Sequence, residues 1–444
     1  MRTLRYIFIL FVLGTIFSSC KNEIDSPAPS HGDADFTRYV ALGSSFTSGY
    51  TDGALYTEGQ QNSFPSMLAK VFSEAGGGTF KQPLVNDDNG IGLDYYNTKL
   101  VLTYGILCDG TMGYLMPYAA SSANQSILNT SVASQGPFNN LGVPGMLSGE
   151  FNDQFFVNRF YARFASNPGG SSLLSEATAL DPTFFTLVIG IEDIFSFAKR
   201  GGEDLPDDTI TSLANFSANV DDVISKLVSG GAKGAITNIP DVSDFAFFNK
   251  IRYDGLVLSA AEAQNLNSIF SAINTSIVFK EGNNPYIVED ATSLPSGLRQ
   301  LKEGELVLFN IPSNDLCNGY GSVNNSNMPW AFEDKHVLDL AELSYIRQNI
   351  FNYNSKLETT ASQNDLAFIN LYDFFKRLSQ GIIVNGVNFN SEFITGKAFS
   401  LDGLQPNPQG YALIANEFIR AINDKYGASL HEVDPNSYPG IKLP

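Results

Sequence analysis

Cysteine, histidine and tryptophan are scarce in this chain of 444 residues, which contains three Cys, three His and one Trp. A structural or catalytic zinc site needs several Cys, His or carboxylate ligands close together, usually at short and regular spacings. The histidines are scattered and the cysteines are not clustered. We therefore predict neither a metal site nor a cofactor.

Basic residues are also few, since 27 Lys and Arg stand against 46 Asp and Glu and the formal net charge is -19. Binding to nucleic acid requires clustered Lys and Arg that neutralise phosphates. The composition therefore argues against a nucleic-acid partner. A hydrophobic content of 43% is enough for one large core or two modest ones.

Long apolar runs are absent after the first twenty residues. At the start of the chain Arg2 and Arg5 precede an apolar run, Tyr6 to Phe17, which is typical of a signal peptide and short for a membrane span. Two serines then lead to Cys20. The arrangement resembles a bacterial lipoprotein signal, in which this cysteine is lipidated and becomes the first residue of the mature protein. An ordinary secretory signal with an incidental cysteine is the alternative.

We therefore interpret residues 1–20 as a lipoprotein signal peptide and residues 21–35, which are polar and contain two prolines, as a flexible tether. The expected location is the outer membrane, on its periplasmic side or at the cell surface, with the Cys20 lipid in the membrane. Export permits disulfides. Cys108 and Cys317 either pair or are both buried thiols, and the sequence leaves both possibilities open.

Apolar strand-like runs alternate with amphipathic helical segments, which predicts an α/β fold with a parallel sheet. Two stretches near 76–135 and 244–330 interrupt the alternation and are interpreted as insertions, and residues 428–444 as a C-terminal tail. The segment Asn140 to Gly145 is expected to be a glycine-bearing turn. The expected strands are Tyr39 to Leu42, Phe184 to Gly190, Ala232 to Ile239 and Leu366 to Leu371, and the expected helices are Gly59 to Phe72, Ile210 to Val228, Ser259 to Ile277, Leu338 to Leu357 and Tyr411 to Tyr426.

Ser45 lies three residues after the end of the first expected strand, in the turn Gly43-Ser44-Ser45. Residues that follow buried parallel strands lie at the carboxyl edge of the sheet, where α/β proteins place their binding and catalytic sites. Ser45 is therefore a candidate nucleophile. The alternative is that Ser44 and Ser45 only cap the following helix, because serine favours that position.

Four sequence blocks in this order resemble the SGNH, or GDSL-type, hydrolase family. They are Ala41 to Phe46, Asn140 to Gly145, Gly190 to Asp193 and Asp402 to Pro406. Connecting segments also resemble lipoprotein members of this family from Bacteroidetes. The resemblance implies a three-layer α/β/α, flavodoxin-like domain with about five parallel strands, spanning residues 36–427.

The resemblance also implies ester hydrolysis. Ser45 stands at the position of the nucleophile, its N–H and that of Gly145 at the positions of oxyanion donors, and Asp402 at that of the acid. Such a site needs a base to take the serine proton, an acid to orient the base, and donors to meet the oxyanion.

Three residues depart from the family's pattern. Ser44 replaces an aspartate in a supporting position, and Glu192 replaces an asparagine whose amide donates to the oxyanion. An ionised glutamate accepts hydrogen bonds and repels negative charge. Gln405 stands where the family has the histidine base, and an amide has no useful basicity. Gln405 can hydrogen-bond to Ser45 but cannot act as general base.

None of the three histidines in the sequence is expected to replace the missing base. His31 lies in the expected tether and His431 in the tail, where solvated side chains are expected, and His336 precedes a long helix. We therefore expect an envelope-anchored, catalytically impaired relative of these hydrolases that acts in ligand binding or assembly. The expected ligand is an ester, acyl or glycan group, and the expected protein partner belongs to the envelope. The alternative is an active serine esterase or lipase whose base is His336 or a carboxylate.

Overall fold

The computed structural model describes residues 28–108, 111–203 and 209–444. The signal peptide, Cys20 and most of the tether lie outside the described residues. Among the helices in the described ranges, none combines the length and apolarity that crossing a bilayer would require. Residues 28–35 are described and lead directly into the first strand, with Ala34 already buried.

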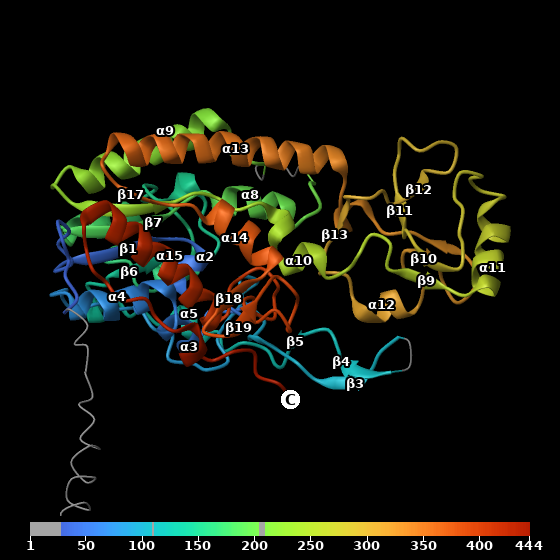
Figure 1. Ribbon diagram of the computed structural model, residues 1–444, viewed down its shortest axis with the longest axis horizontal. Helices are drawn as coiled ribbons and strands as arrows, with labels where there is room; N and C mark the ends of the chain where they lie inside the picture. The colour runs from blue at the N-terminus through green and yellow to red at the C-terminus, as the bar shows by residue number, and fades with distance from the viewer. Residues whose placement is uncertain (1–27, 109–110, 204–208) are drawn as a thin grey trace, which may run out of the picture.

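The centre of the molecule is a five-stranded parallel sheet in the order β17-β8-β7-β1-β6 (Figure 1). Numbered along the chain, this order is 2-1-3-4-5 read from the β6 edge, which is the flavodoxin-like arrangement. The strands are largely buried because helices cover the sheet on both sides, and β1, β7 and β17 consist almost entirely of apolar residues. The strands are β1 (Tyr39–Gly43), β6 (Asn140–Gly142), β7 (Phe184–Val188), β8 (Lys233–Thr237) and β17 (Ala367–Ile369).

One helical layer consists of α9 (Leu213–Val228) and α13 (Leu340–Gln363), which lie above the sheet in Figure 1. Phe216 of α9 stacks on Tyr353 of α13 with ring centroids 3.7 Å apart. Helix α13 begins at a capping box in which Asp339 accepts from the N–H of Glu342, and Glu342 accepts from the N–H of Asp339.

The opposite layer contains α4 (Phe64–Glu74) and α15 (Pro408–Tyr426), joined by the stacked rings of Phe64 and Phe418. Asn407 caps α15 by accepting from the N–H of Gly410, and Pro408 occupies the first helical turn. The predicted three-layer α/β/α architecture with a parallel sheet of about five strands is therefore confirmed.

Several boundaries differ from the sequence-based expectations. The first three residues of the expected turn at Asn140 form edge strand β6, which pairs with β1 through Asn140, Leu141 and Gly142. Close approach explains why glycine is needed there, since a Cβ on Gly142 would lie 2.2 Å from the backbone nitrogen of Ser48. The helix expected over Gly59 to Phe72 is two helices, because the chain turns at Asn62 and Ser63.

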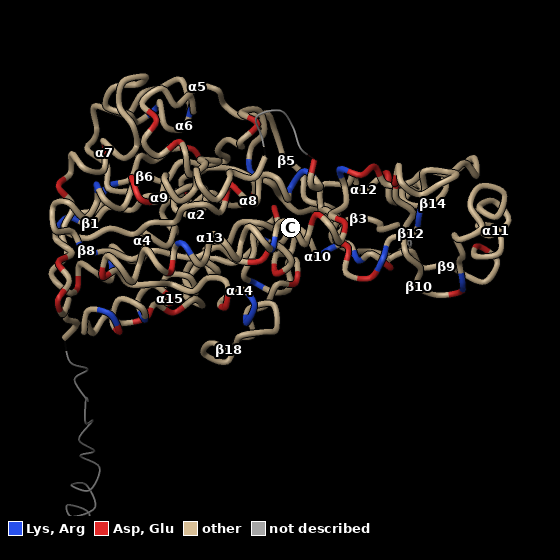
Figure 2. Tube along the Cα trace, turned by 90° about the horizontal axis from the view of Figure 1, so that it is seen from above, with Lys and Arg blue, Asp and Glu red and all other residues tan. Residues whose placement is uncertain are grey.

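The second insertion forms a lobe at one end of the molecule in both Figure 1 and Figure 2. It contains two apolar clusters of its own, one around Phe270 and one around Phe332. Its helix α11 is shorter than the expected segment. The elements are β9 (Leu256–Leu258), α11 (Ala260–Phe270), β10 (Gly282–Asn284), β11 (Ile287–Glu289), β12 (Leu298–Gln300), β13 (Leu306–Val307), α12 (Ser313–Cys317), β14 (Ser322–Val323), β15 (Pro329–Trp330) and β16 (Val337–Leu338).

The first insertion contains two short antiparallel pairs, β2 (Leu100–Val101) with β5 (Tyr118–Ala119) and β3 (Tyr104–Ile106) with β4 (Met112–Tyr114). A disulfide between Cys108 and Cys317 connects this insertion to α12 of the second one. The pairing left open by the sequence is therefore present.

The remaining α-helices and strands of the described residues are α2 (Ser45–Ser48), α3 (Thr57–Gln61), α5 (Ser126–Asn129), α6 (Arg159–Ala162), α7 (Leu173–Ala179), α8 (Ile191–Ala198), α10 (Ala246–Asn249), α14 (Leu371–Gln380), β18 (Ile382–Val384) and β19 (Val387–Phe389).

Candidate functional site

Ser45 lies at the point where the strand order of the sheet reverses. It is the first residue of α2, directly after β1, and β1 lies between β6 and β7. Ligands of open α/β sheets bind beyond the strand ends at this switch point. Ser44 is the N-cap residue of α2, but its side chain makes no capping hydrogen bond. The helix-capping alternative therefore does not explain the serine pair.

Glu192 reaches Ser45 from the neighbouring strand connection. It lies in the first turn of α8, directly after β7, and is 3% exposed. The hydroxyl of Ser45 donates to Oε1 of Glu192 at 2.5 Å. Oε2 of Glu192 lies 3.4 Å from Nζ of Lys199, at the other end of α8. The Ser45 proton is thus held by a carboxylate that is also ion-paired with a lysine.

Gly145 completes this cluster from the segment after β6. Its backbone adopts a φ of +77°, which glycine tolerates, and its N–H donates to Oγ of Ser45 at 3.2 Å. A Cβ on Gly145 would lie 3.0 Å from a methyl group of Leu93, so the first insertion covers this position. The N–H that the sequence suggested as an open oxyanion donor is directed at the serine itself.

Ser45 is 0% exposed. An ester carbonyl must approach the hydroxyl oxygen to within about 3–3.5 Å before attack. With Oγ enclosed and hydrogen-bonded to Glu192 and Gly145, such an approach requires the surrounding residues to move. In this conformation the hydroxyl of Ser45 is therefore closed to an ester.

Asp402 does not orient a base. Its Oδ1 accepts from the N–H groups of Leu404 and Gln405 at 2.8 and 2.7 Å, and its Oδ2 accepts from the N–H of Gly53 at 2.9 Å. The carboxylate therefore holds its own turn together and connects it to the loop after α2. Withdrawal from water raises the pKa of Asp402 to about 6, although the three backbone hydrogen bonds oppose the shift.

The side chain of Gln405 forms no hydrogen bond with any described residue, and its buried Oε1 atom has no partner. Its backbone, in contrast, donates to Asp402 and accepts from the N–H of Ser400. The hydrogen bond from Gln405 to Ser45 that the sequence permitted is absent. Leaving a buried amide oxygen without a hydrogen bond destabilises the folded state by about 1–3 kcal/mol. The sequence alone does not reveal that this oxygen is unpaired.

None of the three histidines is hydrogen-bonded to Ser45. His336 lies next to β16 at the base of the second insertion, where Nδ1 is 3.0 Å from Oδ1 of Asn310 and the ring meets Tyr320 edge-on. Partial burial lowers the pKa of His336. His31 and His431 are exposed. The contact between His336 and Ser45 that would have indicated an active esterase is not present.

A cleft of about 480 Å³ lies on the other side of Asp402, between the body and the two insertions. It is mainly apolar, and its polar groups include Asp402, Asn310 and Asn314. No sequence motif indicates this cleft, because most of its lining belongs to the two insertions. Its walls come from Leu100 and Met116 to Tyr118 of the first insertion, Phe309 to Asn314 of the second, and Phe247, Leu401 and Leu404 of the body.

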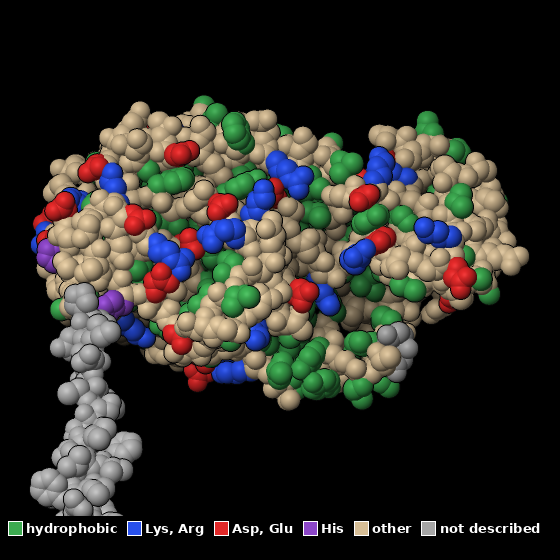
Figure 3. Space-filling view, in the orientation of Figure 1, with side chains coloured by type: hydrophobic (Ala, Val, Ile, Leu, Met, Phe, Trp, Pro, Cys, Tyr) green, Lys and Arg blue, Asp and Glu red, His purple; other side chains and the backbone are tan. Residues whose placement is uncertain are grey.

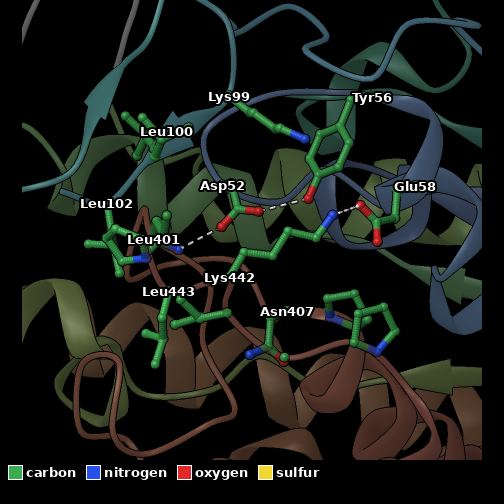
Figure 4. Close-up of a pocket in the computed structure, with 16 residues that line it drawn as sticks. Asp52, Tyr56, Glu58, Lys99, Leu100, Leu102, Leu401, Asn407, Lys442 and Leu443 are labelled. Atoms are coloured by element: carbon green, nitrogen blue, oxygen red, sulfur yellow. Dashed lines mark hydrogen bonds and ion pairs between the residues drawn. The ribbon is translucent and has the colours of Figure 1, made fainter.

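A second cavity, of about 210 Å³, lies between the loop after α2 and the C-terminal segment 439–444 (Figure 4). Asp52 accepts there from the hydroxyl of Tyr56 and from the N–H of Leu401, and Lys442 pairs with Glu58 at 2.7 Å. The C-terminal residues, expected as a tail, are therefore packed onto the body. Leu430 is also buried there.

The stability of the fold should increase as the pH falls from 8 to about 5. Burial raises the pKa of Asp402 to about 6 and those of Glu150 and Glu342 to about 7. A carboxyl group whose pKa is higher in the folded state binds its proton more tightly there. Its contribution is complete below the unfolded value, near 4, and is lost as the pH rises through 6 to 7.

Thermal unfolding at pH 5.5 and pH 8 measures this effect, and we expect a melting temperature several degrees higher at pH 5.5. Glu150→Gln should reduce the difference, while Glu432→Gln, a change in an exposed side chain, should leave it unchanged. A melting temperature that is the same at both pH values, or lower at pH 5.5 than at pH 8, would contradict this prediction.

No protein-family profile matches the chain, and no curated protein matches it either. Solved structures align with it at low similarity. A catalytic mutant of Axe2, an acetylxylan esterase from Geobacillus stearothermophilus, aligns with 64% of this chain and 71% of its own, with 11% identity and a TM-score of 0.29. LAE5, an α/β hydrolase enzyme from the metagenome of Lake Arreo, Spain, aligns with 88% of this chain and 96% of its own, with 11% identity and a TM-score of 0.34.

A protein from Parabacteroides merdae described as a GDSL-like lipase aligns with 89% of this chain and 99% of its own, with 10% identity and a TM-score of 0.33. The sheet order is flavodoxin-like, and Ser45, Gly145 and Glu192 lie together at its switch point.

Proposed function

We propose that this protein is an outer-membrane lipoprotein, anchored through Cys20, in which a hydrolase-like fold binds a ligand without cleaving it. The observation that supports this most strongly is the state of Ser45, which is fully enclosed and donates to the carboxylate of Glu192. No imidazole is hydrogen-bonded to it within the described part of the chain, and the side chain at the position of the base, Gln405, has no hydrogen bond.

The expected loss of activity is large. Removing the base of a comparable triad costs on the order of a millionfold in turnover. Replacing an oxyanion donor costs a further hundredfold to thousandfold, and the carboxylate of Glu192 would also repel the developing negative charge. These effects are not additive, but the loss of the base alone would make esterase activity negligible.

The ligand site is the cleft beside Asp402, because the enclosed serine offers no room. The apolar lining favours an alkyl chain or ring, while Asn310, Asn314 and Asp402 provide acceptors for hydroxyl or amide groups. A carboxylate next to the cleft disfavours an anionic ligand. The chemistry therefore suits a neutral amphiphile, such as an acylated or alkylated sugar.

Binding of octyl β-D-glucoside below its micellar concentration tests this proposal, with affinity measured by titration calorimetry. Asn314 is exposed and lines the cleft, so Asn314→Trp should fill the cleft without disturbing the core and weaken binding at least about tenfold. The matched control is Asn325→Trp, at an exposed asparagine of the same lobe that is not among the cleft residues. Equal affinity in the parent and in Asn314→Trp, or no binding by the parent, would count against the cleft.

One contact favours an alternative function, an active esterase with a carboxylate base. The hydrogen bond of 2.5 Å from Ser45 to Glu192 gives the hydroxyl proton an acceptor. In that case Glu192→Gln would abolish ester turnover by the parent. In the function proposed above, the parent has no turnover to lose.

A further inference from the structure

The hairpin of β3 and β4 has one unusually apolar and exposed face. Tyr104 and Ile106 of β3 lie opposite Tyr114 and Met112 of β4, so all four side chains point to the same side of the hairpin. Ile106 and Met112 are each 71% exposed, and Tyr104 is 51% exposed. We call these four side chains the hairpin face.

The other side of the hairpin is already covered. It carries Gly105 and Gly113, and a Cβ at either position would lie 2.6 Å from a methyl group of Leu115 or Leu107. These leucines fill the space above the glycines. The hairpin therefore has a closed side and an open side, and the apolar side chains are on the open one.

The hairpin face also lacks charge in a strongly acidic protein. Between Leu100 and Ser122 the sequence has one charged residue, Asp109, although the whole chain has a net charge of -19. Figure 3 shows hydrophobic side chains gathered on the lower edge of the molecule, where Figure 1 places β3 and β4. Tyr104 and Tyr114 stack, and their hydroxyls are 2.8 Å apart.

We propose that the hairpin face rests on the lipid surface of the membrane that holds the anchor. Tyrosines with polar tips, together with Ile and Met, suit the boundary between headgroups and acyl chains, and the absence of charge lowers the cost of approach. The proposal depends on the anchor proposed above. From Cys20 to the first described residue, eight extended residues span at most about 28 Å, so the anchor would keep the fold next to the bilayer.

Amide hydrogen exchange on vesicles tests this placement. The chain beginning at Lys21 would carry an N-terminal hexahistidine tag and be attached to phosphatidylcholine vesicles that contain a nickel-chelating lipid. We expect exchange in residues 100–119 to slow at least about tenfold on the vesicles, with no such change at the β18–β19 hairpin. The tag replaces the lipid, so the result does not depend on whether Cys20 is acylated or on any esterase activity.

The variant Ile106→Asn/Met112→Asn should lose this protection. Val257→Asn/Ile383→Asn is the matched control, because these two side chains are 69% and 76% exposed on other hairpins. Protection that is absent in the parent, or equal in both variants, would overturn the proposal. Protection that appears only when envelope proteins are added would also overturn it, since the hairpin face would then bind a protein.

Discussion

The double variant Glu192→Asn/Gln405→His should hydrolyse short-chain p-nitrophenyl esters at least about a hundredfold faster than the same variant carrying Ser45→Ala. The asparagine replaces the carboxylate that now accepts the serine proton, and it supplies an amide donor for the oxyanion. The histidine supplies a base on the turn that Asp402 already holds.

Each single variant should hydrolyse these esters much more slowly than the double variant. In Gln405→His the hydroxyl of Ser45 would still donate to Glu192, and in Glu192→Asn no base would be present. Leu93→Ala added to the double variant should increase the rate again, because Leu93 covers Gly145. If the double variant is as inactive as its Ser45→Ala form and has the same stability as the parent, Glu192 and Gln405 are not the cause of the missing ester hydrolysis.

Removing the disulfide should destabilise the protein by about 2–5 kcal/mol and weaken binding in the cleft. Cys108 and Cys317 are separated by 209 residues, and their link joins the first insertion to the short helix α12, which begins within the cleft lining. In the chain-entropy description, a link that closes so long a loop restricts the unfolded chain strongly. Because both insertions also pack on the body, the measured loss of stability on removing the disulfide will be smaller than this description alone gives.

The measurement is urea unfolding of the parent and of Cys108→Ser/Cys317→Ser, followed by octyl glucoside titration. The double variant avoids leaving one reactive thiol. A reducing agent should lower the stability of the parent toward that of the variant and leave the variant unchanged, which separates loss of the link from effects of the new serines. Equal stability of parent and variant, to within about 0.5 kcal/mol, would contradict the first prediction, and equal affinity for octyl glucoside would show that the cleft does not depend on the disulfide.

The buried strands could be predicted from the sequence, because β1 and β7 are almost continuously apolar and are followed at once by polar site residues. The carboxyl ends of parallel strands meet at one edge, so the strand assignments placed Ser45 and Glu192 near one another, whereas Gly145 was placed beside them only by the family resemblance. Edge strand β6 was missed because three residues, two of them Asn and Gly, give no strand pattern.

The state of the site depends on contacts that a linear pattern does not contain. The enclosure of Ser45, the methyl group of Leu93 over Gly145 and the backbone hydrogen bonds of Asp402 all join distant segments. The sequence indicated that Gln405 cannot be a base, and the structure adds that its side chain takes no part in the hydrogen bonds around Ser45. The cleft was unpredictable for the same reason, since both insertions contribute to it.

The most direct test of the central claim is ester turnover by the unmodified protein, beginning at Lys21, against its Ser45→Ala variant. The enclosed serine, its hydrogen bond to Glu192 and the absence of a histidine contact predict the same background rate for both proteins on p-nitrophenyl acetate and butyrate. Turnover by the parent that disappears in Ser45→Ala would contradict the account and establish an active esterase.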